Sequence, residues 1–360
     1  MACLFDPFPL KDVVLRNRIA VSPMCQYSSV DGYPTDWHLV HLGSRAVGGA
    51  GLVVVEATAV TPEGRISPGD SGIWSDGHVE PLARIARFVR EHGAVPAIQL
   101  AHAGRKASAT RPWEGDNHLE PSEGGWEITA PSAVPFGAYL PRTPREMTRG
   151  DIAAVREAFV AGARRALAAG FQWLELHFAH GYLAHSFYSP ISNHRTDEYG
   201  GSFENRIRFL LETFAAVREV WPAQWPLTAR LSVTDWSDDG VTVDESIELV
   251  RRLKQLGLDL VDVSHNFSKP DVSVVPWGPG FMLPIAARIR HEAEIATAAG
   301  WMITEPRQAD DAVRQEQTDL VMLARAMLRD AYWPFHAAQA LGVDTPQRAL
   351  PVQYAHWLKR

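Results

Sequence analysis

Two imidazoles and a phenol stand close together in this sequence, because His177, His180 and Tyr182 all follow the apolar run 171–176. Such a run is typical of a buried strand, and strand ends that lead into helices are where α/β enzymes collect their chemistry. Positions i and i+3 face opposite sides of a strand but share one face of a helical turn. The two histidines therefore act together only if the chain already turns there, which Gly181 favours.

A turn of this kind directs two ring N–H donors at one point, with Tyr182 beside them, which suits the binding of a substrate oxygen. Two other interpretations stay open. Histidines at strand ends, here also His102, bind catalytic metals in barrel hydrolases, although no clear carboxylate ligand accompanies them. A non-catalytic barrel that binds a ligand, with one long loop as its wall, is the second alternative.

Eight short apolar segments alternate with amphipathic stretches along the chain. All but the seventh have the continuous apolar character of strands that are covered on both faces. The segments are 19–24, 52–60, 95–101, 173–178, 227–233, 260–264, 295–300 and 320–324. Eight strands, each followed by a helix, predict the α/β class and a single (β/α)8 TIM barrel.

Helix signals fit between these strands. Thr148 begins a capping box with Asp151, Ser202 can cap a helix that starts at 203, and Thr242 opens a third that stops before Gly257. The regularity breaks once, from about 104 to 147, where Pro, Gly, Trp and charge abound. We expect this long loop to cover the active-site face, with its first side chains, Arg105 and Lys106, solvated. Residues 1–360 are expected to form one domain.

Composition excludes several function classes. The formal net charge is −7 with both signs mixed, and no basic stripe marks the chain as a partner of nucleic acid or anionic membrane. No apolar run is long enough to span a bilayer, and the start shows no basic segment followed by an apolar one, so we expect no signal peptide. Cys3 and Cys25 are the two cysteines, too few for a disulfide framework, and a cytoplasmic location is expected.

A parallel barrel brings the carboxyl ends of all eight strands to one rim. The loops after the seventh and eighth strands form the phosphate site of such barrels, and Arg325 adds a positive charge there. No Gly-x-Gly-x-x-Gly motif in a Rossmann setting and no Walker loop is present. A phosphate monoester such as FMN suits this rim better than a dinucleotide.

Four segments at this rim resemble the Old Yellow Enzyme family, and more narrowly its subgroup of xenobiotic reductases and YqjM-like ene-reductases. They are 23–27, 99–105, 177–182 and the long, specific motif 195–202. The likeness runs from about Leu4 to Trp357. A dienoyl-CoA reductase or an amine-dehydrogenase-like protein of the wider family carries a cysteine cluster and an added nucleotide-binding domain. This sequence has two cysteines and one expected barrel, so it does not favour either protein.

The resemblance implies a barrel with tightly bound FMN that takes hydride from NADPH or NADH. The hydride then passes to the activated alkene of an enone, enal, maleimide or nitro compound, and both substrates use one face in turn. A homo-oligomer is also implied, a dimer before a tetramer.

The resemblance also assigns residues. Gln99 would pair with the pyrimidine edge of the flavin, Arg230 would lie near N1–C2=O, and Arg325 would hold the phosphate. The whole implied flavin set is Ser22, Pro23, Met24, Cys25, Ala57, Gln99, Arg230, Trp301, Met302, Ala324 and Arg325. His177 and His180 would hold the substrate oxygen and Tyr182 would protonate the α-carbon. Tyr27, Trp301 and Trp357 would complete the substrate pocket.

Two positions depart from the pattern of the family. Met302 stands where glycine is common, which affects the geometry of the phosphate loop, and Ala331 stands where proline is usual. The second lies in a C-terminal tail that is expected to reach across a dimer interface.

Overall fold

Eight parallel strands close into a barrel in this computed structural model, which describes residues 2–359. Around the barrel the strands follow the order β10-β11-β12-β3-β4-β5-β8-β9. Their bounds are β3 (Ile19–Val21), β4 (Leu52–Ala59), β5 (Val95–Ala101), β8 (Trp173–Phe178), β9 (Leu227–Ser232), β10 (Leu260–Ser264), β11 (Ala296–Ala299) and β12 (Leu320–Leu323). Each lies within a predicted segment, so the predicted TIM barrel is confirmed.

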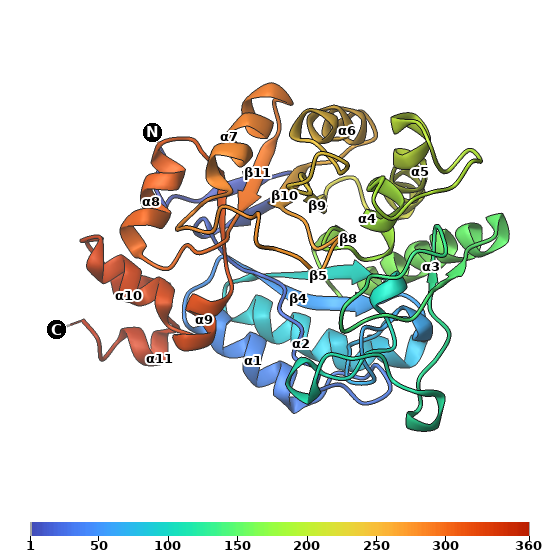
Figure 1. The fold of residues 1–360 in the computed structure, drawn as a ribbon. Coiled ribbons are helices and arrows are strands. Elements are labelled where there is room, and N and C mark those ends of the chain that lie inside the picture. The colour runs from blue at the N-terminus through green and yellow to red at the C-terminus, as the bar shows by residue number, and fades with distance from the viewer. Residues whose placement is uncertain (1, 360) are drawn as a thin grey trace.

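Helices surround the barrel (Figure 1). They are α1 (Asp36–Val47), α2 (Val79–Glu91), α3 (Arg149–Ala168), α4 (Leu183–Tyr188), α5 (Phe203–Val220), α6 (Val243–Gln255), α7 (Leu283–Glu292), α8 (Pro306–Arg314), α9 (Arg325–Arg329), α10 (Trp333–Ala340) and α11 (Val352–Ala355). The three predicted caps are in place, because the side chains of Thr148, Ser202 and Thr242 each accept a bond from the backbone three residues on.

Strand side chains alternate between two cores. On β8, Leu174, Leu176 and Phe178 face outward and pack in the large core beneath the helices. Trp173 faces the barrel interior, together with Leu52, Leu260 and other apolar side chains near the amino ends of the strands. Glu175 and His177 follow Trp173 at intervals of two, so they also face inward and lie higher in the barrel.

A hairpin that the sequence analysis did not predict closes the amino end of the barrel. Strands β1 (Phe8–Leu10) and β2 (Val13–Leu15) pair antiparallel, and Phe8, Val13 and Leu15 pack against the interior apolar cluster. These strands are three residues long, too short for a periodic signal in the sequence.

The segment 104–147 consists of short turns and two small strands. It contains η3 (Gly104–Lys106), η4 (Pro112–Glu114) and η5 (Pro121–Glu123), while β6 (Thr129–Ala130) pairs parallel with β7 (Arg145–Glu146). The expectation that Arg105 is solvated is wrong: it is 1 % exposed and donates to the carbonyl of Ser268 at 2.6 Å. Burial follows because backbone carbonyls of two loops converge on this guanidinium.

Within residues 2–359, no helix is both long and apolar enough to cross a membrane.

Candidate active site

The chain turns directly after β8, and the turn brings three rings together. His180 and Gly181 have φ angles of +62° and +72°, and a Cβ at Gly181 would lie 2.0 Å from the carbonyl oxygen of Phe267, so only glycine fits there. The ring centroids of His177 and His180 are 4.9 Å apart, and that of Tyr182 lies 5.1 Å from His177. The two imidazoles and the phenol therefore line one small volume.

His177 presents a single N–H donor. The backbone N–H of Ala179 donates to His177 Nδ1 at 3.3 Å, which assigns the proton of the neutral ring to Nε2. Burial, with the nearby Arg230 cation, holds the pKa of His177 well below its usual value. The ring therefore stays neutral at physiological pH.

His180 shares one oxygen atom with a tryptophan. His180 Nε2 lies 2.6 Å from Ser264 Oγ, and Trp301 Nε1 donates to the same hydroxyl at 3.1 Å. Burial likewise lowers the pKa of His180 well below its usual value. A substrate oxygen bound here must compete with Ser264 for His180.

Tyr182 is a neutral phenol with a buried amine above its ring. Burial raises the pKa of Tyr182 well above its usual value, so the proton stays on the oxygen. Lys106 Nζ lies 5.1 Å from the Tyr182 ring centroid and 4.6 Å from that of Phe136, and it donates to the carbonyl of His180 at 3.0 Å. Burial lowers the pKa of Lys106 to about 7. The expectation of a solvated Lys106 is therefore wrong.

Below the histidines, the barrel interior holds four polar side chains. Gln99 Nε2 donates to Glu175 Oε1 at 2.7 Å, across the pair β5–β8. Arg230 Nε lies 3.1 Å from Asp262 Oδ2, across β9–β10, without the alignment of a hydrogen bond. Arg230 is also the register partner of His177, so it connects this layer to the histidines.

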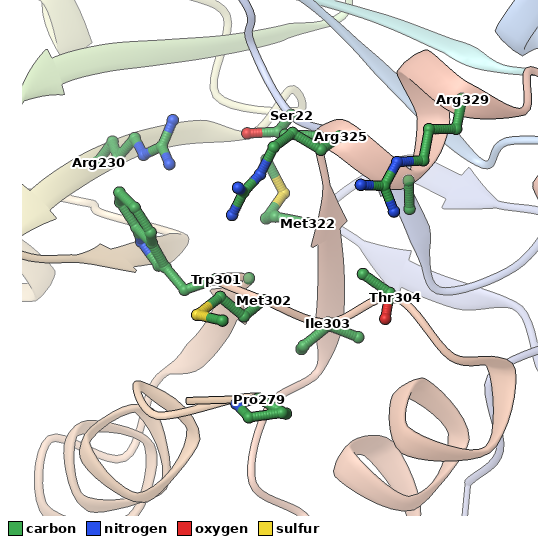
Figure 2. A pocket seen from close by; sticks show the side chains of 13 residues that line it. Ser22, Arg230, Pro279, Trp301, Met302, Ile303, Thr304, Met322, Arg325 and Arg329 are labelled. Atoms are coloured by element: carbon green, nitrogen blue, oxygen red, sulfur yellow. The ribbon is translucent and has the colours of Figure 1, made fainter. Parts of the chain in front are cut away.

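A cavity of about 340 Å³ opens beside this interior. Figure 2 shows Arg325 and Arg329 pointing into it from α9, with Arg230 at another side. Six of the predicted flavin residues line it, namely Ser22, Arg230, Trp301, Met302, Ala324 and Arg325. Trp301 and Met302 have φ angles of +70° and +57°, in the left-handed region that glycine adopts more easily than other residues. This conformation gives a physical reason why the family commonly has glycine at the position of Met302.

Another group of the predicted residues gathers around Tyr182. Cys25 and Tyr27 pack with Tyr182 against a small apolar cluster that includes Ile66, and Ala57 lines a small cavity with Tyr182 and the buried Asp70. Burial raises the pKa of Cys25 well above its usual value, so its thiol stays protonated.

Comparison with known proteins decides the class of this site. The family model of the NADH:flavin oxidoreductase / NADH oxidase family matches residues 3–343. The chain belongs to this family. It is 49% identical over 341 residues to the NADPH dehydrogenase of Geobacillus sp. (strain WCH70), covering 94% of each chain. It is 48% identical over 353 residues to the NADPH dehydrogenase of Geobacillus thermodenitrificans (strain NG80-2), covering 98% of this chain and 97% of the relative.

A solved structure of morphinone reductase in complex with tetrahydroNAD has the same fold, with a TM-score of 0.79 and 25% identity. The match covers 94% of this chain and 91% of that one. The resemblance drawn from the sequence motifs is thus confirmed, and the chain is a flavin-dependent oxidoreductase with FMN as its cofactor.

The residues present fit FMN. Arg325 and Arg329 place two guanidinium groups at the edge of the cavity where a phosphate needs charge-assisted donors. Arg230 lines the cavity and its Nε, which faces Asp262, forms no hydrogen bond, so the guanidinium can also donate to a ligand. Gln99 keeps its amide oxygen free of the Glu175 contact, as an acceptor for a ring N–H.

Some site residues escaped the sequence analysis. Arg329 lines the cavity one helical turn after Arg325, a spacing that the sequence displays. Ser264, Lys106 and Glu175 act through contacts between distant segments, for which the sequence carries no local signal. The alternation along β8 does place Glu175 on the inward face with His177.

Trp357 lies outside these cavities. It follows α11 near the C-terminus and is 78% exposed, in a tail where Val352, Tyr354 and Leu358 are also exposed. Figure 1 shows α11 beside α9 and α10 at the edge of the molecule.

Proposed function

We propose that this enzyme is an FMN-dependent ene-reductase that takes hydride from NADPH, or NADH, and reduces the activated C=C bond of α,β-unsaturated carbonyl or nitro compounds. The observation that carries the proposal is the trio of neutral, buried donors around one point, with ring centroids 4.9 and 5.1 Å apart. FMN, when bound, supplies the two-electron hydride chemistry. The protein residues hold the substrate and move the proton.

His177 and His180 orient the substrate by donating to its carbonyl or nitro oxygen. The neutral His177 ring offers Nε2–H, and His180 offers Nε2 where it now contacts Ser264. Both donors draw electron density toward that oxygen, which makes the β-carbon electrophilic, as an oxyanion hole does. Their low pKa values keep them as hydrogen-bond donors without full positive charge.

Tyr182 is the general acid in this proposal. Its high pKa keeps the proton on the phenol until the α-carbon becomes basic enough to take it. Lys106 faces the Tyr182 ring and favours the phenolate that remains after proton transfer. Tyr27 and Trp301 would wall the pocket that Tyr182 and His180 line.

The predicted flavin residues are assigned to separate parts of FMN. Gln99 and Arg230 would meet the pyrimidine edge, and Arg325 with Arg329 would hold the phosphate, while the cavity walls come from the remaining predicted set. Pro23 and Met24, between Ser22 and Cys25, would contribute backbone groups, since Met24 itself packs against the main core. NADPH is the proposed donor because the two relatives are named NADPH dehydrogenases.

We also propose a homodimer in which the exposed tail around Trp357 reaches the partner's pocket. An apolar tail with Trp357 78% exposed gains from burial against a second copy. The metal-dependent hydrolase has no observation in its favour, because among residues 2–359 no three His, Cys, Asp or Glu side chains gather as metal ligands.

Anaerobic spectroscopy of the purified enzyme tests the proposal. NADPH should bleach the flavin absorption, and 2-cyclohexenone should then restore it in a separate step. A bleached flavin that neither an enone nor a nitroalkene reoxidises would reject an ene-reductase, and a protein that takes up no FMN would reject the flavin site as well.

A further inference from the structure

Two buried carboxyl groups lie inside the barrel beneath the proposed flavin contacts. Glu175 on β8 is 2% exposed and Asp262 on β10 is 1% exposed, and neither takes part in the mechanism above. Each touches one of the two side chains proposed to meet the pyrimidine edge: Glu175 accepts from Gln99, and Asp262 lies against Arg230. The carboxyl groups therefore stand behind the flavin contacts, one strand away in each case.

Charge in this layer does not balance if both carboxyls ionise. Among residues 2–359 the layer has two acids and one cation, since Arg230 is the guanidinium there and His177, two residues along β8, is kept neutral. Thr228 from β9, which accepts from Trp173 Nε1, adds a hydroxyl but no charge to the barrel interior. An unpaired buried carboxylate is costly, so one acid holds its proton into the neutral pH range.

Glu175 is the group that holds this proton. Burial, and then the Asp262 carboxylate, raise the pKa of Glu175 to about 8, against the opposing effects of Arg230 and Gln99. Burial also raises the pKa of Asp262, but Asp262 has the closer guanidinium: Arg230 Nε lies 3.1 Å from Asp262 Oδ2, and this contact favours the ionised form of Asp262.

We propose that Glu175 is a positioning residue with a redox-linked proton: it fixes the amide of Gln99 and takes up one proton from solvent when the flavin gains two electrons. This inference rests on the FMN site of the proposed function. Reduction would place negative charge at the N1–C2=O edge, which the proposed function assigns to Arg230, the residue in contact with Asp262. Negative charge favours the protonated form of Glu175.

The step balances. NADPH gives a hydride, which carries two electrons and one proton, to the flavin and leaves as NADP⁺. Above about pH 8, where Glu175 is ionised in the oxidised enzyme, one solvent proton converts its carboxylate to the carboxylic acid, and the protein interior gains no net charge. When the alkene accepts the hydride and Tyr182 supplies the other proton, Glu175 returns its proton to solvent and the Tyr182 phenolate takes one from solvent. No further oxidant or reductant is needed.

The proton uptake has a defined pH window. Below about pH 8 Glu175 already carries its proton in the oxidised enzyme, so reduction adds none there. Above that pH the carboxylate becomes protonated on reduction, up to the higher pKa that the reduced flavin imposes. Each additional proton per two electrons steepens the line of potential against pH by about 30 mV for each tenfold change in proton activity.

Redox potentiometry of the FMN-loaded enzyme from pH 6 to 10 tests this, with mediator dyes and the flavin spectrum as readout. The wild type should show the steeper line above about pH 8, and Glu175→Gln should lack it. A pH indicator in weak buffer should report one proton fewer taken up by Glu175→Gln on reduction at pH 9. Parallel lines for the two proteins, with equal proton uptake, overturn the inference.

Two further variants sharpen the result. Asp262→Asn removes the charge that raises the pKa of Glu175, so the onset of the steep region should move to lower pH; an unmoved onset counts against the inference. Asp235→Asn is the matched control. Asp235 is also a buried acid, 2% exposed, but it bonds Ser189 and Ser268, and its pKa is lowered to about 2, so the slope should keep its wild-type form.

If Glu175→Gln does not fold, the wild-type line and the Asp262→Asn shift still decide the question. A wild-type line of constant slope from pH 7 to 10 overturns the inference while leaving the ene-reductase proposal intact. A protein that binds no FMN overturns both.

Discussion

The two ends of the barrel interior differ sharply although the same strands build them. Near the amino ends, inward positions carry apolar side chains such as Leu52, Trp173 and Leu260, and the β1–β2 hairpin covers them. Near the carboxyl ends, inward positions of β8 and β10 carry the buried acids Glu175 and Asp262, and β9 adds Arg230. Side chains alternate between inward and outward positions along the whole of each strand. Only the types of the inward residues differ between the two ends.

This difference separates stability from chemistry along each strand. Trp173 packs in the closed end with its Nε1 satisfied by Thr228 at 3.0 Å, whereas Arg230 Nε stays without a hydrogen-bond partner. Burial of apolar side chains at the closed end stabilises the fold. This stabilisation offsets the cost of burying polar groups at the open end. Substitutions at the two ends should therefore affect different measurements.

The largest effect is expected at the open end. Tyr182→Phe should slow the alkene-reducing half-reaction about 10²- to 10⁴-fold, because the general acid is lost. Flavin reduction by NADPH should change little, since it needs no proton from Tyr182. Anaerobic stopped-flow absorbance resolves the two steps, and equal loss in both would remove Tyr182 from its role.

At the closed end, Trp173→Ala should lower the free energy of unfolding by about 3–5 kcal/mol through the cavity it leaves. Trp173 is 1% exposed and packs against the interior cluster. Denaturant unfolding measures this loss, while the folded variant should retain the wild-type rates of both half-reactions. A specific defect in alkene reduction with normal stability would contradict the separation of the two ends.

His177→Ala should weaken the binding of phenolic and enone ligands at the open end by about 1.5–3 kcal/mol, the value of a buried hydrogen bond to a charge-accumulating oxygen. Perturbation of the flavin spectrum on ligand titration gives the dissociation constant. Unchanged affinity would show that His177 does not touch the ligand oxygen.

A smaller, pH-dependent effect is expected from Lys106. Its pKa is lowered to about 7 by burial, below the usual 10.5, so the unfolded chain binds more protons between these values. The free energy of unfolding should therefore rise with pH from 7 to 10, by at most about 1.4 kcal/mol per pH unit from this group. Lys106→Met should flatten that rise in denaturant titrations at pH 8, 9 and 10, and an identical slope would place Lys106 in solvent.

The sequence predicted the features that periodicity and local chemistry encode. Continuous apolar runs marked seven of the eight strands, Thr148 and Ser202 marked helix starts, and the His177–Tyr182 spacing with Gly181 indicated a turn. Short or distant contacts were not predictable. The three-residue strands of the hairpin have no measurable period, and the burial of Arg105 depends on carbonyls 29 to 163 positions away.

Other features of the site could be predicted from the sequence only in part. Glu175 sits on the inward face with His177, so its burial follows from alternation, but its bond to Gln99 depends on the β5–β8 register. The left-handed backbone of Trp301 goes against local preference for a bulky residue, and so only the fold determines it. Strain of this kind gathers at sites of function, as it does at this rim.

The central claim is that a fixed oxygen clamp and Tyr182 deliver a proton to one face of the α-carbon. Reduction of 2-methylcyclohexenone in D₂O, with NADPH as donor and the product analysed by NMR and chiral chromatography, tests it most directly. The account predicts deuterium at the α-carbon in a single enantiomer of the product. A racemic α-carbon formed by the wild-type enzyme would mean that solvent, not Tyr182, supplies the proton, and would contradict the account.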